Sequence, residues 1–414
     1  MLTMKKNRTR LIGPAGVVAG VAMLAPAGSV AGQCEYDVTV IQAPECPPYG
    51  FPPTTGLGIN KHGHVVGHYF DLVALHDRAF LWTPEEGFVT LPLAPGAYDQ
   101  SAEDINDRGV IVGTATLSGV GDRGFVYKDG QYTILPPAQG KGWSSAIAIN
   151  NKGEVAGTRS IGDGVLPENA YFWSEATGFI DLGLMDAPKS MGRDLNEAGD
   201  VVGLRGVAVA SDEAFLWHNG ELSFLGVVPG GFTSAALGLN NQGQIVGVGL
   251  IDDPEGGDPY GRAFLWSSGA MESLEVPSGF RSSTAVAIND LGQGVGKCTA
   301  KPSGDWHSFL WQHGAAHDLN NLVPPGYGAL ERSWGINNVG QILADGEIVP
   351  GYAVAYLLTP KDRPRGDTDC DCEVNVSDLL WILRDWGSTD SLADTNYDGI
   401  VDVLDLLIVL ENWG

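Results

Sequence analysis

Two acidic segments near the C-terminal end have the residue types and the spacing of calcium ligands. In the second segment, side-chain oxygens stand at positions 1, 3, 5, 9 and 12 of a twelve-residue loop, with glycine at position 6 and a backbone carbonyl at position 7. The residues are Asp394, Asn396, Asp398, Ile400, Asp402 and Asp405. Because oxygen ligands in this order are typical of helix-flanked calcium loops, the sequence predicts a Ca²⁺ site here.

The same pattern occurs 27 residues earlier in the chain. Its members are Asp367, Asp369, Asp371, Glu373, Asn375 and Asp378. Position 6 is Cys372 instead of glycine, which strains the sharp turn that the loop needs. We therefore expect two calcium sites, of which the second is the stronger. The alternative is an acidic, solvated tail without metal.

The tail, residues 367–414, resembles a type I dockerin. This module carries paired calcium loops and binds cohesin domains in multi-enzyme polysaccharide-degrading complexes. The resemblance rests on the two loop spacings and on matching blocks at 374–387 and 401–414, in which an Asp-Leu-Leu sequence follows each loop. It implies a cohesin-like partner. After each loop, helical spacing aligns apolar residues that should pack face to face: Leu379, Leu383 and Trp386, then Leu406, Leu410 and Trp413.

A repeat organises most of the remaining chain. Asn-x-x-Gly followed by a short apolar run recurs at Asn60, Asn106, Asn150, Asn196, Asn240, Asn289 and Asn337, at spacings of 44 to 49 residues. A second motif such as Ala79-Phe80-Leu81-Trp82 follows each copy. Asn first and Gly fourth are typical of a type I turn, so each unit is interpreted as four short strands.

Four strands in about 45 residues is the period of a β-propeller blade. The sequence thus predicts a mainly β chain with a seven-bladed β-propeller over 33–360, a linker at 361–366 and a small α-helical calcium-loop module at 367–414. A β-solenoid is the alternative. The last copy lacks a fourth strand, whereas residues 36–41 alternate like a strand ahead of the first copy. We expect this N-terminal strand to complete the last blade, which removes two open sheet edges.

Residues 56–358 resemble the bacterial extracellular repeat family called HAF, named for a His-Ala-Phe form of the second motif. The first letter has drifted here, for example to Arg78 and Asn169, and remains His at His307. The resemblance implies export and a propeller-like fold. It implies no catalytic residue.

Aromatic residues stand at a similar register in the variable loops between blades or in the loop before a third strand. They are Tyr98, Trp143, Phe232, Phe280, Trp306 and Tyr327. Such an array could stack on sugar rings or hold a peptide; the alternative is wedge packing between blades. Trp306 is the best candidate because it lies outside both repeat motifs. No nucleophile elbow, HExxH motif or phosphate loop occurs, and no pair of carboxylates stands out from the repeat, so no catalytic residue is predicted.

The N-terminus and the charge restrict localisation and partners. Residues 1–31 combine four basic residues, an apolar run and small residues before a cleavage point, which is typical of a secretory signal peptide. A net charge of −26 disfavours nucleic acid as a partner, and no later stretch is long and apolar enough to span a membrane. Cys298 is expected to be a buried small residue.

These features together predict a secreted, extracellular or cell-surface protein. Its propeller would be non-catalytic and bind a polysaccharide or an extracellular protein, and the dockerin-like module would tether it to a complex or to the cell surface. The alternative is a polysaccharide-degrading enzyme, a glycosidase or a lyase, docked into a multi-enzyme complex.

Overall fold

The structure is a computed structural model of the 414-residue chain. It describes residues 35–414 except 46–49, 138–141, 163–166, 184–186, 207–211, 255, 313, 349–351, 362–363, 365, 369–372, 389–392, 394 and 396–399. The predicted signal peptide lies outside the described residues. In the part that the structure describes, no helix is long and apolar enough to cross a membrane.

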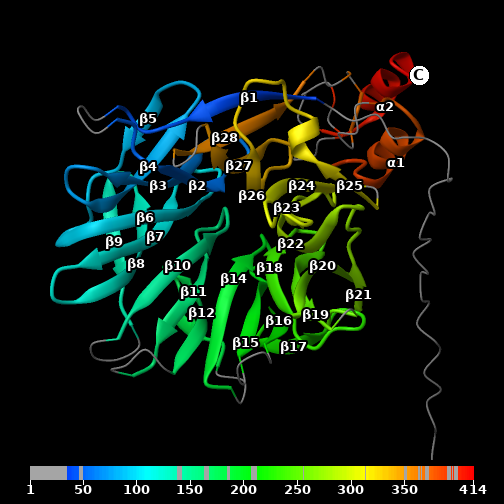
Figure 1. Cartoon of the computed structure of the whole chain (residues 1–414). Helices are drawn as coiled ribbons and strands as arrows, with labels where there is room; N and C mark the ends of the chain where they lie inside the picture. Colours follow the sequence, from blue (N-terminus) through cyan, green and yellow to red (C-terminus); the bar gives the residue numbers. More distant parts are fainter. Residues whose placement is uncertain are drawn as a thin grey trace, which may run out of the picture.

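The chain is mainly β, and each sheet follows the last along the sequence (Figure 1). The first sheet contains β2 (Thr54–Ile59), β3 (Val65–Asp71), β4 (His76–Thr83) and β5 (Gly87–Thr90). The second contains β6 (Ala97–Ile105), β7 (Ile111–Leu117), β8 (Gly121–Lys128) and β9 (Gln131–Leu135).

Eight strands form the next sheet: β10 (Ser144–Ile149), β11 (Val155–Ser160), β12 (Glu168–Ser174), β13 (Gly178–Asp181), β14 (Lys189–Leu195), β15 (Val201–Gly206), β16 (Asp212–His218) and β17 (Glu221–Gly226). One parallel pairing, Glu168 with Lys189, joins its two halves. Each half repeats the four-strand order of the other sheets.

Three further four-stranded sheets complete the order. One contains β18 (Ala235–Leu239), β19 (Ile245–Ile251), β20 (Tyr260–Ser267) and β21 (Ala270–Ser273). The next contains β22 (Phe280–Ile288), β23 (Gly294–Ala300), β24 (Trp306–Gln312) and β25 (Ala315–Asp318), followed by a 3-10 turn at Leu319–Asn321. The last contains β26 (Leu330–Ile336), β27 (Ile342–Glu347), β28 (Ala353–Pro360) and the N-terminal strand β1 (Tyr36–Ile41).

The N-terminal strand pairs where the sequence predicted. β1 runs antiparallel to β28, with Tyr36 opposite Pro360 and Ile41 opposite Ala355. Tyr36 and Ile41 are buried, so this strand contributes apolar contacts as well as backbone hydrogen bonds. Contacts between the sheet of β26 and that of β2 then join the last unit to the first.

The repeated Asn and Gly residues form the turns and the close approaches of the sheets. In the first unit, Asn60 Oδ1 accepts hydrogen bonds from the backbone N–H groups of His62 and His64, both at 3.0 Å. Gly63 closes the turn with φ of +74°. A Cβ on Gly67 would lie 2.0 Å from the Thr55 carbonyl oxygen, so only glycine fits beside the bulge of the preceding strand.

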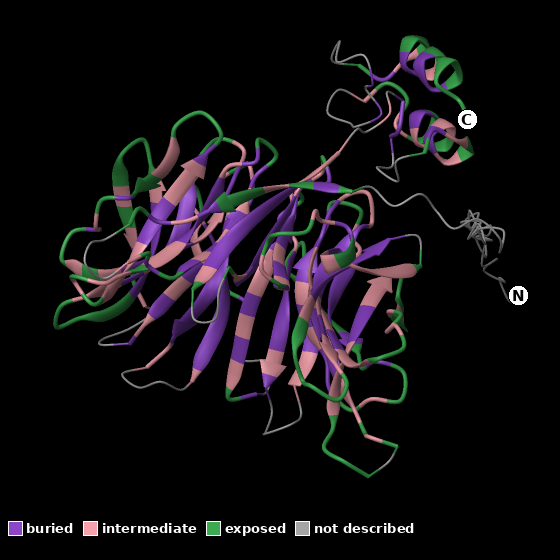
Figure 2. Ribbon diagram, turned by 45° about the horizontal axis from the view of Figure 1, so that its top comes forward, coloured by how far each residue is buried: buried purple, intermediate pink, exposed green. Residues whose placement is uncertain are grey.

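The cores lie between successive sheets, where Figure 2 shows the strands buried and the connecting loops exposed. One cluster combines Ile41, Leu343 and Leu357 of the last sheet with Val65 and Phe80 of the first. The Phe of the second motif is wholly or almost wholly buried at Phe80, Phe125, Phe215, Phe264 and Phe309. Cys298 is also fully buried and unpaired, which confirms the expectation for it.

The tail contains two helices, α1 (Val376–Arg384) and α2 (Val403–Glu411). Their small core is made of Val374, Ile382, Ala393, Val401 and Val409, with Leu379 and Leu406 partly buried against it. The predicted face-to-face stripes are therefore only partly correct. Leu383, Trp386, Leu410 and Trp413 are about half exposed, because residues of the loops fill the space between the helices.

Candidate functional site

A cavity of about 550 Å³ lies along the first strands of the sheets, β2, β6, β10, β14, β18, β22 and β26. These strands surround the middle of the arrangement in Figure 1. Most of the wall is apolar or small, with residues such as Leu57, Ile147, Leu237 and Val286. The charged members of the wall are Glu103, Asp104, Arg193, Asp194, Lys297 and Arg332.

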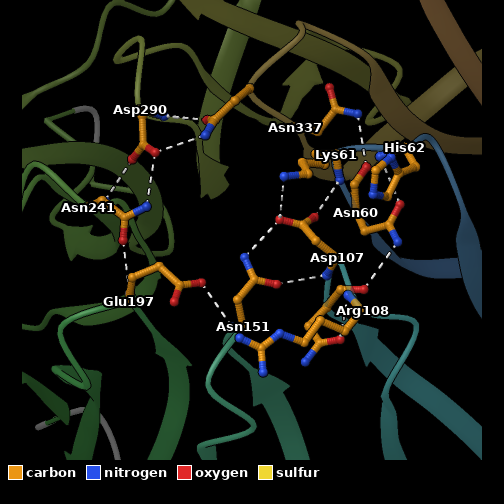
Figure 3. Close-up of polar contacts among 12 residues, drawn as sticks. Asn60, Lys61, His62, Asp107, Arg108, Asn151, Glu197, Asn241, Asp290 and Asn337 are labelled. Carbon is orange, nitrogen blue, oxygen red and sulfur yellow. Dashed lines mark hydrogen bonds and ion pairs between the residues drawn. The ribbon is translucent and has the colours of Figure 1, made fainter. Parts of the chain in front are cut away.

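Next to this cavity lie the seven repeated asparagines, which we call the asparagine ring; the hollow that they line shares Ile59, Asp104, Ile288 and Ile336 with the cavity. Six of them donate their side-chain N–H to the backbone carbonyl of the next asparagine, as Asn60 does to Asn106 at 3.1 Å. Asn337 donates to Asn60 at 3.0 Å across 277 residues, which closes the circle (Figure 3). Asn196 donates to Asp200.

A second series of hydrogen bonds, with six links, joins the residues that follow these asparagines. The backbone N–H of Lys61 donates to Asp107, that of Asn151 to Glu197 and that of Asn241 to Asp290 (Figure 3). A hollow of about 220 Å³ lies among these residues. Because their oxygens already accept backbone hydrogen bonds, we assign this hollow a structural role.

Glu103 and Arg193 stand three residues before their asparagines, at a position that is Leu, Ile or Val in four other copies. Burial raises the pKa of the Glu103 carboxyl, and the Ser101 hydroxyl, His68 and Arg193 partly oppose this rise. Ser101 Oγ lies 3.2 Å from His68 Nδ1. Arg193 Nε is buried without a hydrogen-bond partner, and burial lowers the pKa of this guanidinium.

Asp104 and Asp194 come directly after Glu103 and Arg193. Each accepts the backbone N–H of the next residue and one from the adjacent unit: Asp104 from Ile149 at 2.9 Å and Asp194 from Leu239 at 2.7 Å. Burial raises the pKa of both carboxyls to about 7. Both oxygens of each carboxylate accept a hydrogen bond, and one of the two donors belongs to a neighbouring unit, so these residues connect adjacent units.

Another part of the wall combines cations with indole rings. Arg332 Nε donates to both oxygens of Asp345, at 3.1 and 2.9 Å, and Trp334 Nε1 donates to the same carboxylate at 2.9 Å. Lys297 Nζ lies 3.6 Å from the centre of the Trp306 ring. Burial, followed by the charge of Arg332, lowers the pKa of Lys297. Burial also raises the pKa of Asp345, although Trp334 and Arg332 oppose that rise.

The six aromatic residues predicted to bind ligand differ in exposure and in contacts. Tyr98, Phe232, Trp306 and Tyr327 are each about two-fifths exposed but belong to different sheets or loops. Phe280 packs edge-on against Phe309, with ring centres 4.9 Å apart, which is wedge packing. Trp143 is half-buried. Trp306 lies beside cavity residues, because Lys297 and Arg332 both approach its ring.

The structure describes seven of the twelve predicted calcium ligands or loop positions. These are Asp367, Glu373, Asn375, Asp378, Ile400, Asp402 and Asp405; the other five lie outside the described residues. Among the described residues no cluster of three or more potential metal-binding side chains is present.

The two loops nevertheless end with the same geometry. Asp378 and Asp405 are fully buried and accept backbone N–H groups from Thr368 and Thr395, at 2.5 and 2.7 Å. Each is the third residue of its helix and accepts the backbone N–H of the N-cap residue, Asn375 or Asp402. Calcium binding remains a prediction.

The charged residues of the cavity were missed at the level of sequence because no short motif joins them. Glu103 and Arg193 are 90 positions apart, and only the stacking of units places them on one wall. A signal was nevertheless present. Glu103-Asp104 and Arg193-Asp194 replace the apolar and small residues that the other copies carry before the asparagine.

Neither a family model nor a curated protein matches this chain. Solved structures similar to it include an acylaminoacyl peptidase from Pyrococcus horikoshii, with a TM-score of 0.46, 14% identity, and coverage of 74% of this chain and 51% of that one. The β-propeller domain of the Trilobed protease from Pyrococcus furiosus matches with a TM-score of 0.44 and 10% identity, over 70% of this chain and 91% of that one. The chain spans about half the length of the acylaminoacyl peptidase.

Dipeptidyl peptidase 4 from Porphyromonas gingivalis matches with a TM-score of 0.42 and 8% identity, over 73% of this chain and 52% of that one. Prolyl endopeptidases and a puromycin hydrolase are also matched. These neighbours are enzymes, and they contradict the expectation of a non-catalytic propeller that only binds a ligand, which is not retained. With TM-scores of 0.42–0.46 and identities of 8–14%, these similarities assign no particular activity to this chain.

Proposed function

We propose that the chain is a hydrolytic enzyme whose reaction takes place in the central cavity, with Glu103 as the proton donor. The observation that carries this proposal is the setting of the Glu103 carboxyl. It belongs to the wall of a cavity of about 550 Å³ and, among the described residues, forms no ion pair. A carboxylic acid whose pKa is raised by burial is suited to protonate a leaving group.

The reaction can be written with atoms in balance. The Glu103 carboxyl gives its proton to the leaving oxygen or nitrogen of the substrate as the bond from that atom to carbon breaks. A water molecule adds its oxygen to the same carbon, and a proton from this water returns to the Glu103 carboxylate. The products are the two fragments of the substrate, one with a new hydroxyl and the other with a new hydrogen.

Neighbouring residues would orient the acid and stabilise charge. Ser101 hydrogen-bonds to Glu103 and lies 3.2 Å from His68 Nδ1, so it fixes the direction of the carboxyl. The Arg193 guanidinium also lines the cavity and would stabilise a substrate oxygen that becomes negative during the reaction. A fixed donor in a site shielded from water is more effective than the same donor in solvent.

The test compares Glu103→Gln with the original chain and with Glu175→Gln, a control at an exposed turn. A panel of chromogenic amides, esters and glycosides is assayed between pH 4 and 8. We expect turnover of at least one class, a loss of about 10²-fold or more in Glu103→Gln and none in the control. Activity should fall as the pH rises through the raised pKa of Glu103. Absence of turnover across the panel, or full activity of Glu103→Gln, would refute the proposal.

We also propose that the fold is a propeller of seven blades. The eight-stranded sheet is then two blades joined by one pairing, and the β1–β28 pairing closes the last blade. The asparagine ring supports this count, because it contains one asparagine for each four-strand unit and returns from Asn337 to Asn60.

For the tail we propose two Ca²⁺ ions, bound by the oxygens of the two loops, and export of the chain as the N-terminal segment indicates. The matching geometry of Asp378 and Asp405 supports two equivalent loops. Each carboxylate oxygen that accepts one N–H retains a second lone pair, so these hydrogen bonds are compatible with a metal. A cohesin-like domain is the partner that the resemblance to dockerins suggests.

A further inference from the structure

We propose that the wall formed by Lys297, Arg332, Trp306 and Trp334 binds the carboxylate of a ring-containing organic acid. This inference rests on the proposed function, because it assigns the substrate class of the same cavity. The four residues, called here the cationic wall, come from β23, β24 and β26. Lys297, Arg332 and Trp334 line the cavity that also contains Glu103.

The first argument is the charge of Lys297. The chain has 24 basic and 50 acidic residues, so an acidic neighbour is available to most cations. Among the described residues, however, no carboxylate lies within ion-pair distance of Lys297 Nζ, which instead lies over the Trp306 ring. Burial and the charge of Arg332 lower its pKa, so its charge carries a cost that Asp345 and Glu331 offset only in part. A bound anion would remove that cost.

The second argument is that Asp345 and Trp334 fix the position of the Arg332 guanidinium. Asp345 accepts two bonds from its Nε and a third from Trp334, and the guanidinium lies 4.6 Å from the centre of the Trp334 ring. The structure shows no hydrogen bond from its two terminal nitrogens to any described residue. A guanidinium fixed at one edge, with its remaining donors free, can pair with a planar carboxylate through two parallel bonds.

The third argument concerns the part of the ligand beyond its carboxylate. Trp306 is two-fifths exposed beside Lys297, and an exposed indole offers a flat apolar surface to a ring. The nearby cavity wall is apolar or small at Val286, Ala287 and Leu237. An aromatic acid or a hexuronate combines a ring with one carboxylate and so matches both features, whereas inorganic phosphate matches only the cations.

The test measures binding without turnover, by calorimetry on the full chain carrying Glu103→Gln. The probes are benzoate, glucuronate and their uncharged methyl esters, with inorganic phosphate and acetate as separate arms. We expect at least one ring acid to bind and its ester to bind about tenfold more weakly or not at all. Lys297→Met and Arg332→Gln should each weaken binding of the ring acid by about tenfold. Lys128→Met, at an exposed strand end, should leave this affinity unchanged.

Two further variants separate recognition from packing. Trp306→Ala should weaken binding of the ring acids and leave the affinity for acetate unchanged. Trp143→Ala, in another unit, should change neither affinity. Lys297→Met should keep or raise the melting temperature, because it removes a partly buried charge with no acidic partner. A lysine that only stabilised the fold would lower it when replaced.

The inference is overturned if acid and ester bind equally, if phosphate binds as tightly as the ring acids, or if Lys297→Met leaves the affinity unchanged. Failure of the proposed function gives a different result. In that case the ring acids bind through the cationic wall, but the original chain hydrolyses none of the esters, amides or glycosides.

Discussion

Replacement of Asn337 by Asp tests whether the asparagine ring holds the first and last units together. In the structure Asn337 Oδ1 accepts the backbone N–H groups of Val339 and Gln341, at 3.2 and 2.9 Å, and Nδ2 donates to the Asn60 carbonyl at 3.0 Å. Aspartate keeps the acceptor that forms the turn and removes the donor. The substitution therefore removes the bond that joins the two units, together with one bond from Nδ2 to Gln341 Oε1 at 2.9 Å within the same turn.

The expected cost follows from the groups left behind. Asn337 and Asn60 are both almost fully buried, so the Asn60 carbonyl loses its donor where little water can replace it. A buried polar group without its partner costs about 1–3 kcal/mol, and the new carboxylate facing this carbonyl adds repulsion. We expect Asn337→Asp to lower the free energy of unfolding by about 2–4 kcal/mol. Asn337→Ala, which also deprives two backbone N–H groups of their acceptor, should cost more.

Urea unfolding followed by tryptophan fluorescence gives the free energies. Asn106→Asp is the matched variant within the ring, since its Nδ2 donates to the Asn150 carbonyl at 2.9 Å. Asn219→Asp is the control, at an exposed turn outside the ring. If Asn337→Asp and Asn106→Asp are both as stable as the control, the ring hydrogen bonds contribute nothing and the reasoning is wrong.

Three more predictions concern closure, pH and metal. A chain that lacks residues 1–41 should melt about 5 °C or more below a chain that lacks only 1–34, because the two buried side chains of β1 and its pairing with β28 are lost. Equal melting temperatures would contradict closure by this strand. The folded-state pKa of Asp104 and of Asp194 is raised to about 7, above the usual ~3.9 of the unfolded chain, so the folded state retains these protons longer and stability falls as the pH rises from 4 to 7. After allowance for water in the cavity this loss is about 1–2 kcal/mol per carboxyl, and Asp104→Asn with Asp194→Asn should flatten the pH profile; an unchanged profile would show that neither carboxyl titrates in this range. Calorimetry should find two Ca²⁺ ions per chain, and Asp405→Ala should lose the stronger site while Asp378→Ala loses the weaker; no calcium uptake by the original chain would remove the metal assignment.

The strands and their order could be predicted because the positions that make them recur in every unit. Asn60 shows why the period was so clear. Its side chain accepts two N–H groups of its own turn and donates to the next unit, so no other residue type replaces it without loss. Gly67 is constrained in the same way by the Thr55 carbonyl. The pairing of β1 with β28 was predictable because the last copy lacked a fourth strand.

The packing of the tail helices and the cavity could not be predicted by the same reasoning. Helical spacing puts Leu379 and Leu383 on one stripe, but only Leu379 packs against the core. The spacing also does not show that Val374 and Val401 of the loops fill the space between the helices. For the cavity, the distance between Glu103 and Arg193 depends on how the units stack side by side around it. That is a property of the closed arrangement and not of any local segment.

The repeat itself indicates where function should be sought. A residue needed for the fold recurs in each unit, as the ring asparagines do. The buried aromatic residue of the second motif also recurs, as Phe in five units and as Tyr171 and Tyr356 in the other two. A site in the central cavity receives one equivalent position from each unit. An asymmetric arrangement of chemical groups there therefore requires residues that differ between these equivalent positions. Glu103, Arg193 and Trp334 occupy one such position, where other units place Leu, Ile or Val. Buried charges cost stability and the apolar alternative is present in the same chain, so the charges of Glu103 and Arg193 are departures that the fold does not require.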